Sequence, residues 1–426
     1  MNRIVMYDHT LRRTSIKANL TAQRWYPTAL ALPNGDVWVP GGTWAQKPNG
    51  TWPKAAGADV YRPYDNRVTQ VPLNKKLWEA AIGNWYMGSL VLPSGKVATM
   101  NMNMMQVVDP YTGAALAEAP GLPDPVENMV WEFPRMGPQV MLRADVITPG
   151  KPMRYEFMAF GGSFIDAALR KDIAKCGPVT CDREKGEQRT CSEYSVRIGL
   201  VLHPNGRHVF DRQWVVEKMP GPRCIFDGVV LPNGHVVLIG GQQRGIGDLT
   251  NATHYNGGNQ PWNKPWIYNP YAKAGQRYSI PGATTKIARL YHSVAQLTSQ
   301  GDLLATGTSN AKFWESSDSK DFSRTPLGVN EYRQELFLPP YLFRANRPAR
   351  AAPEAPSWVP YGGTFQMGYR FPDAPEQTSD SERRRRKDAA CKSCGSIMNP
   401  QSAGCVQAQA ASALCLNGSP QPTLFV

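Results

Sequence analysis

The stretch RWYPTALALPNGDVWVPGG, residues 24–42, decides the fold, because close variants of it recur along the chain. In each copy an aromatic or apolar pair leads through about seven residues to a Pro-Asn-Gly type of turn, followed by a second apolar run. The recurrences are WYMGSLVLPSG at 85–95, CIFDGVVLPNGHVVLIGG at 224–241, YHSVAQLTSQG at 291–301 and a fragment, FMAFGG, at 157–162. Hairpins that recur in this way predict an array of blades.

The copies share one register, since the turn glycine follows the second residue of the leading pair by nine positions in each full copy. Trp25, Trp85, Cys224 and Tyr291 are therefore equivalent positions. In a propeller each would begin an innermost strand beside the central channel, so we expect these side chains to converge across the axis. For Trp85 and Tyr86 we favour plain packing between neighbouring sheets.

The composition also favours an all-β protein. Glycine and proline number 38 and 37, and charged residues make up only 19% of the chain, which is typical of many short strands joined by tight turns. The net charge of +13 is scattered or gathered in the basic run 383–387, which is predicted to be a solvated tail, so we expect no nucleic-acid partner. No stretch approaches the ~20 apolar residues of a membrane helix, so no membrane span is expected.

Cysteines and glycosylation sequons indicate an oxidising compartment and a secreted glycoprotein. Asn-x-Thr sequons begin at Asn19, Asn49 and Asn251. We favour disulfides over a zinc site, because no histidine follows the Cys-x-x-Cys pair near the C-terminus. Residues 1–26 contain no apolar segment like that of a signal peptide, so the chain is cytosolic or its true N-terminus is missing. The eight cysteines are Cys176, Cys181, Cys191, Cys224, Cys391, Cys394, Cys405 and Cys415.

Four segments make the repeat resemble a known family. In chain order they are residues 24–42, residues 222–241 (PRCIFDGVVLPNGHVVLIGG), residues 289–294 (RLYHSV) and the closing residues 335–342 (ELFLPPYL). They resemble the copper radical oxidases, that is, the glyoxal oxidases and galactose oxidases. The resemblance spans most of residues 20–345. It implies a kelch-like β-propeller of the seven-bladed type, or that type lacking one blade.

The same resemblance implies a copper site and a reaction. Tyr26 matches the tyrosine that the family cross-links to cysteine as a radical cofactor, Tyr291 matches the axial tyrosine and base, and His292 matches one histidine ligand of a single copper ion. Trp44 resembles the indole that stacks over the cross-linked tyrosine in galactose oxidase. Imidazole and phenolate are both good copper ligands.

The reaction implied by the family is the oxidation of a small aldehyde, such as glyoxal or methylglyoxal, or of a primary alcohol. Copper and a tyrosyl radical would together take two electrons from this substrate and pass them to O2, which gives hydrogen peroxide. The resemblance further implies an extracellular or cell-wall enzyme, and we expect a monomer.

The chain departs from the family at two points. The family places its cross-linking cysteine before the Arg-Trp-Tyr motif, whereas here no cysteine precedes Cys176. The family takes a second histidine ligand from its C-terminal domain, whereas here His292 is the last histidine. Both missing groups belong to the copper site, so the resemblance predicts an impaired oxidase.

Other residues are weak substitutes for the missing groups. Three histidines flank hairpin turns, and a turn lies ~30 Å from the strand starts, which is too far to reach the same ion. Cys224 has the register for the axis and is the one internal candidate for a replacement thioether, although a single buried thiol more often acts as a small hydrophobe. The three histidines are His203, His208 and His235.

The predicted organisation is a propeller over residues 1–344, a linker over 345–357 and a truncated or divergent Ig-like domain over 358–426. The last region includes a disordered basic tail that holds cysteines, and we expect little packed structure beyond Pro372. Two further hypotheses remain beside the impaired oxidase: a non-catalytic propeller that binds a partner and derives from such an oxidase, and an incomplete gene model.

Overall fold

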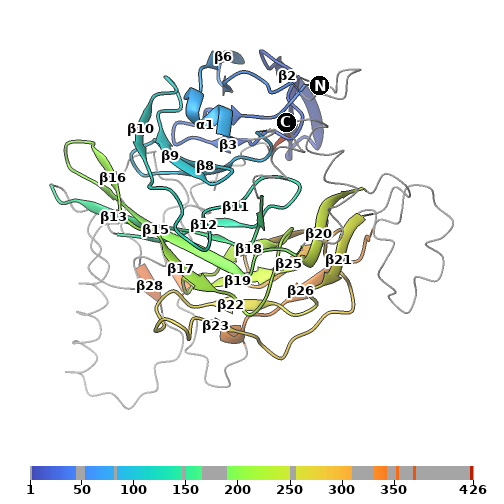
Figure 1. The fold of residues 1–426 in the computed structure, drawn as a ribbon. Helices are drawn as coiled ribbons and strands as arrows, with labels where there is room; N and C mark the ends of the chain where they lie inside the picture. Colours follow the sequence, from blue (N-terminus) through green and yellow to red (C-terminus); the bar gives the residue numbers. More distant parts are fainter. Residues whose placement is uncertain are drawn as a thin grey trace, which may run out of the picture.

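The computed structural model describes residues 2–44, 53–80, 84–145, 150–165, 190–249, 256–308 and 331–342, and three short strands at 352–354, 368–370 and 423–425. Within these ranges the chain is almost entirely β-structure (Figure 1). The described residues include a short helix, α1 (Lys75–Ala80), and a single 3-10 turn, η2 (Pro340–Leu342). None of the helical segments in these ranges has the length and apolarity needed to cross a bilayer.

Five antiparallel sheets follow one another along the chain as blades of a β-propeller (Figure 1). The all-β propeller expected from the repeat is therefore confirmed, while a total of seven blades remains a prediction. Blade one contains β3 (Leu30–Ala31), β4 (Val37–Pro40), β5 (Ala58–Arg62) and β6 (Arg67–Val71). Blade two contains β7 (Gly88–Val91), β8 (Val97–Asn101), β9 (Met104–Val108) and β10 (Ala115–Glu118).

Blades three to five continue the same pattern. Blade three contains β12 (Gln139–Ala144), β13 (Met153–Phe160), β15 (Tyr194–Leu202), β16 (His208–Phe210) and β17 (Val215–Lys218). Blade four contains β18 (Asp227–Val230), β19 (Val236–Ile239), β22 (Trp266–Tyr268) and β23 (Tyr278–Ser279). Blade five contains β24 (Val294–Leu297), β25 (Leu303–Thr306) and β26 (Glu335–Phe337). The fragment at 157–162 and the closing segment at 335–342 thus supply strands β13 and β26, as expected.

Three smaller pairings lie beside the blades. Strands β1 (Arg3–Asp8) and β2 (Arg13–Asn19) pair with each other. Ile4 and Leu20 share a core cluster with Val37, Val39 and Tyr61 of blade one. The other two pairs are β11 (Met129–Val130) with β14 (Ser163–Phe164), and β20 (Gln242–Leu249) with β21 (Asn256–Pro261).

The hairpin turns form where the repeat places them. Gly35 and Gly234 have φ of +87° and +78°, which only glycine adopts without strain. Their backbone amides donate to the carbonyls of Leu32 at 2.9 Å and Leu231 at 2.8 Å, which closes each turn. The register of nine residues is thus set by the length of one strand that leads from the axis to a glycine turn.

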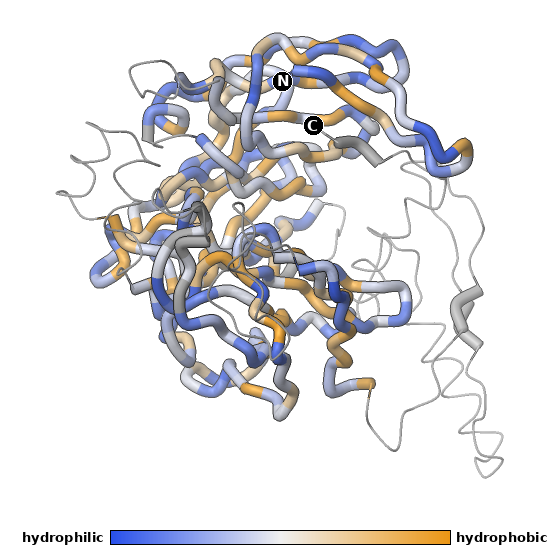
Figure 2. The backbone as a smooth tube through the Cα atoms, turned by 90° about the vertical axis from the view of Figure 1, so that its right-hand side faces the viewer, coloured by the Kyte–Doolittle hydropathy of each residue, from blue (hydrophilic) through white to orange (hydrophobic). Residues whose placement is uncertain are grey.

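Hydrophobic side chains hold neighbouring blades together face to face. Trp38 and Val60 of blade one share a cluster with Met87 and Val97 at blade two. Similar clusters join blades two and three, and blades three and four. Figure 2 shows orange, hydrophobic segments alternating with blue, hydrophilic ones along the tube. The burial of one apolar face against the next is the main force that stabilises such an array.

The C-terminal strands bear on the predicted domain boundaries. Strand β27 (Ala352–Glu354) lies in the expected linker and pairs with β28 (Gly368–Arg370) of the expected appended domain. Strand β29 (Thr423–Phe425) pairs with β1 beside the N-terminus (Figure 1). Beyond Pro372 the structure describes these three residues alone, so the expectation of little packed structure there stays a prediction. The basic run 383–387 and most of the predicted Ig-like domain lie outside the described residues.

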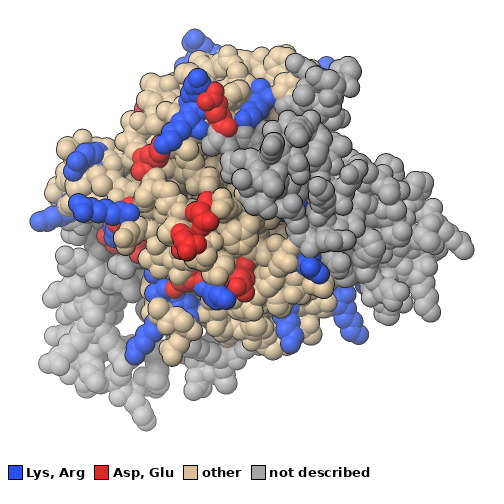
Figure 3. Space-filling model, in the orientation of Figure 1, with Lys and Arg blue, Asp and Glu red and all other residues tan. Residues whose placement is uncertain are grey.

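Charged side chains are mixed over the visible surface. On the face drawn in Figure 3, lysine and arginine are scattered among aspartate and glutamate rather than aligned in one stripe. The ion pairs Arg62–Asp65 and Arg154–Asp211 join neighbouring opposite charges at 2.8 and 2.5 Å.

Candidate active site

Tyr26 and Tyr291 meet at the centre of the structure. Their hydroxyl oxygens lie 2.7 Å apart and share a hydrogen bond, although 265 positions separate the residues in the chain. Tyr26 precedes β3 of blade one, and Tyr291, which is 6% exposed, precedes β24 of blade five. The shared register predicted that residues before the first strand of different blades lie close together, and the contact between Tyr26 and Tyr291 agrees with this prediction.

The residues around this pair form one cluster of side chains. Trp85, Cys224 and Tyr291 are buried in it, and Trp25 and Tyr26 pack against it. All four positions that the register made equivalent are thus neighbours. Trp85 is fully buried within this cluster, and its indole N–H donates to the Thr43 hydroxyl at 3.0 Å.

Aromatic rings enclose Tyr26 on several sides. Trp25 stacks on it at 3.7 Å between ring centroids, Tyr86 stacks at 4.7 Å, and Phe133 meets its edge at 5.1 Å. Phe133 also lies 5.7 Å from the ring of Tyr291. Burial raises the pKa of Tyr86, and the nearby Tyr26 raises it further, so Tyr86 is a neutral phenol at physiological pH.

The sequence favoured plain packing between sheets for Tyr86 and gave no role to Phe133, whereas the rings of both contact Tyr26. Tyr86 shares the register of Tyr26, and its backbone N–H donates to the Tyr26 carbonyl at 3.0 Å, so the register was the signal that could have found it. Phe133 begins blade three, where no Pro-Asn-Gly turn follows, and the repeat therefore gave no signal there.

His292 and Trp44 are the two other candidate residues. His292 is exposed, and its ring stacks on that of Tyr291 at 3.7 Å, so it lies beside the phenol pair. Trp44 is 48% exposed, and its backbone N–H donates to the Pro53 carbonyl at 2.8 Å. The rings with defined stacking on Tyr26 are those of Trp25 and Tyr86, so the stacking role of Trp44 remains a prediction.

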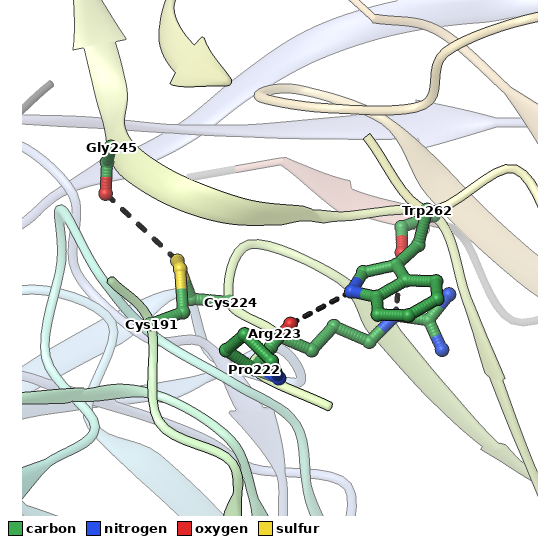
Figure 4. The surroundings of a disulfide bond; sticks show 7 residues. Cys191, Pro222, Arg223, Cys224, Gly245 and Trp262 are labelled. Carbon is green, nitrogen blue, oxygen red and sulfur yellow. Dashed lines mark hydrogen bonds between the residues drawn. A yellow bond between two sulfur atoms is a disulfide. The ribbon is translucent and has the colours of Figure 1, made fainter. Parts of the chain in front are cut away.

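Cys224 is not a free thiol. It is therefore neither a source of a replacement thioether nor a small buried thiol, the two roles considered from the sequence. It forms a disulfide with Cys191, and the two Cα atoms lie 5.5 Å apart. The reason is that residue 191 lies on a segment whose backbone N–H donates to the Gln243 carbonyl, next to the Cys224–Gln242 pairing. Figure 4 shows the Cys224 sulfur facing the Gly245 carbonyl, 4.0 Å away. The expected preference for disulfides holds for this pair, and the other six cysteines lie outside the described residues.

Three buried arginines, each one or two residues before a position of the aromatic cluster, form hydrogen bonds and ion pairs within their own blades. Arg223 is fully buried, and its guanidinium donates to the carbonyls of Gly240, Leu238 and Lys264 at 2.9, 3.3 and 3.1 Å. Trp262, seen beside it in Figure 4, donates its indole N–H to the Pro222 carbonyl at 2.7 Å. Arg24 and Arg289 anchor blades one and five through ion pairs with Asp59 and Glu335, both at 2.8 Å. The arginines of the motif are therefore structural anchors.

Two phenol oxygens 2.7 Å apart can contact the same metal ion, because copper binds oxygen at ~2 Å. The imidazole of His292 beside Tyr291 is a third donor of suitable chemistry. Among the described residues, no group of three His, Cys, Asp or Glu side chains could hold a metal ion. The donor set on the axis is thus two phenols and one imidazole, which fits copper incompletely.

The sequence profile of a family described as Glyoxal oxidase N-terminus matches residues 7–341. The chain belongs to the glyoxal oxidase family. Among curated relatives, it is 26% identical over 351 residues to Aldehyde oxidase GLOX of Vitis pseudoreticulata, a match that covers 82% of this chain and 56% of that protein. It is 25% identical over 361 residues to Aldehyde oxidase GLOX1 of Arabidopsis thaliana, covering 82% of this chain and 50% of that protein.

The glyoxal oxidase match covers only part of these proteins, since the chain spans about half the length of the curated relatives it matches. Among solved structures, a fungal alcohol oxidase of the AA5 family in complex with copper superposes with a TM-score of 0.55 and 16% sequence identity. That match covers 88% of this chain and 66% of the alcohol oxidase, and it supports the fold assignment.

Proposed function

We propose that this member of the glyoxal oxidase family is a copper radical oxidase. Its substrates would be small aldehydes, such as glyoxal and methylglyoxal, or primary alcohols, and it would act outside the cell or in the cell wall. An aldehyde hydrate and O2 would give a carboxylic acid and hydrogen peroxide, so two electrons and two protons pass from substrate to oxygen. The observation that carries the proposal is the Tyr26–Tyr291 hydroxyl pair, which joins residues that precede blades one and five.

The residues that would hold copper are Tyr26, Tyr291 and His292. Copper supplies one of the two oxidising equivalents when bound, and a tyrosyl radical supplies the other. Tyr26 is the redox tyrosine in this proposal, because the stacked rings of Trp25 and Tyr86 can share and shield an electron deficit on it. Tyr291 would accept the substrate hydroxyl proton, since its oxygen is the one paired with Tyr26.

We further propose that the chain by itself is a poor oxidase. Three donors leave copper one protein ligand short, so water would fill the open position and weaken binding. Both described cysteines are joined in the Cys191–Cys224 disulfide, so neither offers Tyr26 a thioether. The same observation favours the second candidate function, a propeller that binds a partner without catalysis.

Copper loading tests the proposal. The purified chain receives one equivalent of Cu(II); electron paramagnetic resonance reports binding, and peroxide release from methylglyoxal and galactose reports turnover. We expect wild type to bind copper more tightly than His292→Ala and Tyr291→Phe, with little peroxide. Equal copper affinity in all three proteins would overturn the site and favour the binding module. Robust turnover that depends on His292 would overturn the impairment.

A further inference from the structure

Blade one carries a hollow, lined by both apolar and polar side chains, at the turn end of its strands, and the oxidase proposal does not use it. The hollow has a volume of about 300 Å³, at the lower end of the range for small-molecule sites. Its lining includes Asn34 and Asp36 of the first hairpin turn, Arg62 and Tyr64 of the second, and Tyr111 from blade two. Tyr26 stands at the opposite end of the first strand, up to about 26 Å away at the rise of an extended chain.

The floor of this hollow is a buried carboxylate. Asp36 is 2% exposed, and its Oδ2 accepts hydrogen bonds from the Tyr111 hydroxyl at 3.0 Å and the Asn34 amide at 2.9 Å. Both donors use the same oxygen. Within the described parts of the chain, no side chain forms an ion pair with Asp36. Partial burial and the bond to Asp36 raise the pKa of Tyr111 to about 12, and the hydrogen bond from this phenol holds the carboxylate in place.

Two exposed aromatic rings form the rim. Tyr64 is 77% exposed and Tyr111 is 46% exposed, so both rings are accessible to a ligand in the hollow. The guanidinium of Arg62 lies 5.3 Å from the Tyr64 ring and pairs with Asp65 at 2.8 Å. Its Nε is buried and has no hydrogen-bond partner among the described residues. The hollow therefore presents an acceptor, a donor and two ring faces, and its carboxylate, Asp36, has no cationic partner among the described residues because Arg62 pairs with Asp65.

Equivalent turns in other blades lack this combination. The strand registers align Tyr61, Val108 and Tyr268, so Tyr64, Tyr111 and Tyr271 occupy the same place in three blades. The residue equivalent to Asp36 is Lys96 in blade two, where it pairs with Asp109 at 2.6 Å, and His235 in blade four, beside Tyr271. A buried acid between two exposed tyrosines thus distinguishes blade one among these three blades.

We propose that this hollow binds a neutral sugar residue of a polysaccharide. One face of a pyranose ring carries C–H groups that pack on a tyrosine ring, and its hydroxyls both donate to carboxylates and accept from guanidinium and amide N–H groups. The two tyrosines offer the packing surfaces, while Asp36 and Arg62 offer the polar partners. An inorganic anion fits less well, because a buried carboxylate forms the floor.

Affinity electrophoresis of the full chain tests this proposal without copper, so its result is independent of the oxidase proposal. Native gels contain hydroxyethylcellulose, galactomannan or arabinoxylan, which are neutral, because a chain of net charge +13 would bind acidic polymers non-specifically. We expect the wild type to migrate more slowly in at least one of these gels than in a gel without polymer, relative to a basic reference protein, cytochrome c, that moves toward the same electrode. Tyr64→Ala should weaken this binding about five- to ten-fold through the loss of one packing surface.

Tyr271→Ala is the matched control, since Tyr271 has the same place in blade four and is 59% exposed. It should bind like wild type. Asp36→Asn, which keeps the side-chain size, should also weaken binding, and thermal unfolding shows whether each variant is folded. The proposal is supported only if Tyr64→Ala and Asp36→Asn reduce the retardation and Tyr271→Ala does not. No retardation of wild type, or any other pattern among folded variants, overturns it.

Discussion

A left-handed backbone conformation recurs at the residues that approach the propeller axis. Tyr26, Tyr86, Ile225 and His292 have φ between 50° and 64°, in a region that is costly for residues other than glycine. Because the conformation occurs in several blades, it belongs to the blade architecture. In two of these blades the adjacent rings stack at 3.7 Å, as Trp25 on Tyr26 and Tyr291 on His292. The blade thus provides the arrangement that the candidate site uses.

Tyr86 gives a prediction about pH at this scale. Its pKa is raised above 10 in the folded chain by burial and by Tyr26, so the folded state keeps a proton that the unfolded state loses. Stability is therefore full below pH 10 and falls above it. Tyr86→Phe keeps the stacked ring and removes the ionisation. We expect equal stability at pH 8 and a variant about 1 kcal/mol more stable than wild type at pH 11, measured by urea unfolding. Parallel pH curves for the two proteins would contradict this.

The sequence predicted the position of single residues where they belong to a recognised motif or share the register of the repeat. It placed Tyr26, Tyr291 and His292 in one region, and the structure brings their side chains together. It marked Tyr86 by the register but could not show that two equivalent rings from neighbouring blades stack. It could not find Phe133, because the position depends on how blade three packs rather than on a local pattern.

Between elements, polar contacts link one blade to the next. Asp227 at the start of β18 accepts a hydrogen bond from the backbone N–H of Ala295 in β24, and burial raises the pKa of this carboxyl to about 7. The raised pKa means that the folded state holds a proton between about pH 4 and pH 7 that the unfolded state has lost. Stability contributed by the neutral carboxyl is therefore lost as the pH rises through this window.

Asp227→Asn tests this link, because the amide oxygen still accepts from Ala295 and no longer ionises. We expect the variant and wild type to be equally stable near pH 4. By pH 8 the variant should be more stable by about 2–4 kcal/mol. The measurement is the free energy of unfolding in urea at each pH. A difference that does not change with pH would show that the carboxyl titrates normally.

The Cys191–Cys224 disulfide joins the segment before β15 to the start of blade four. It closes a loop of 33 residues, which in the chain-entropy account stabilises the fold by about 3–4 kcal/mol. We expect Cys191→Ala, Cys224→Ala and the double variant all to lose about this amount, since either change breaks the same bond. Urea unfolding measures the three losses. Single losses that add up in the double variant would show that each cysteine contributes by packing alone.

The elements were largely predictable, and their pairing was less so. Apolar runs on either side of a glycine turn predicted the hairpins of blades one, two, four and five. The disulfide partner was not predictable, because the sequence does not show which of several cysteines meet in space. The pairing of β29 with β1 was missed for the same reason, since 416 positions or more separate the paired residues Val5–Tyr7 and Thr423–Phe425.

At the scale of the whole molecule, the Tyr26–Tyr291 contact depends on the assembly of the blades. Tyr26 and Tyr291 are 265 positions apart, so their hydrogen bond forms only when the five blades between and including theirs are in place. Contacts of this sequence separation form late and slowly, because the long loop must be closed first. The tyrosine pair is thus a property of the assembled propeller, and no single blade contains it.

The proposed copper site gives the last prediction, because the second histidine ligand that it lacks concerns copper binding and the cross-linking cysteine that it lacks concerns the radical. Free imidazole can fill an open copper position in solution, whereas nothing in solution can form a thioether on Tyr26. Adding imidazole in small excess over copper should therefore shift the electron paramagnetic resonance spectrum of the protein-bound copper toward more nitrogen ligands. Peroxide release from methylglyoxal should stay low, since ligand and radical act as one unit and the repair of one does not restore the other. In His292→Ala the spectrum should start with fewer nitrogen ligands and need more imidazole to reach the same end point. A large rise in wild-type turnover with imidazole alone would show that Tyr26, held between Trp25 and Tyr86, is oxidised without a thioether.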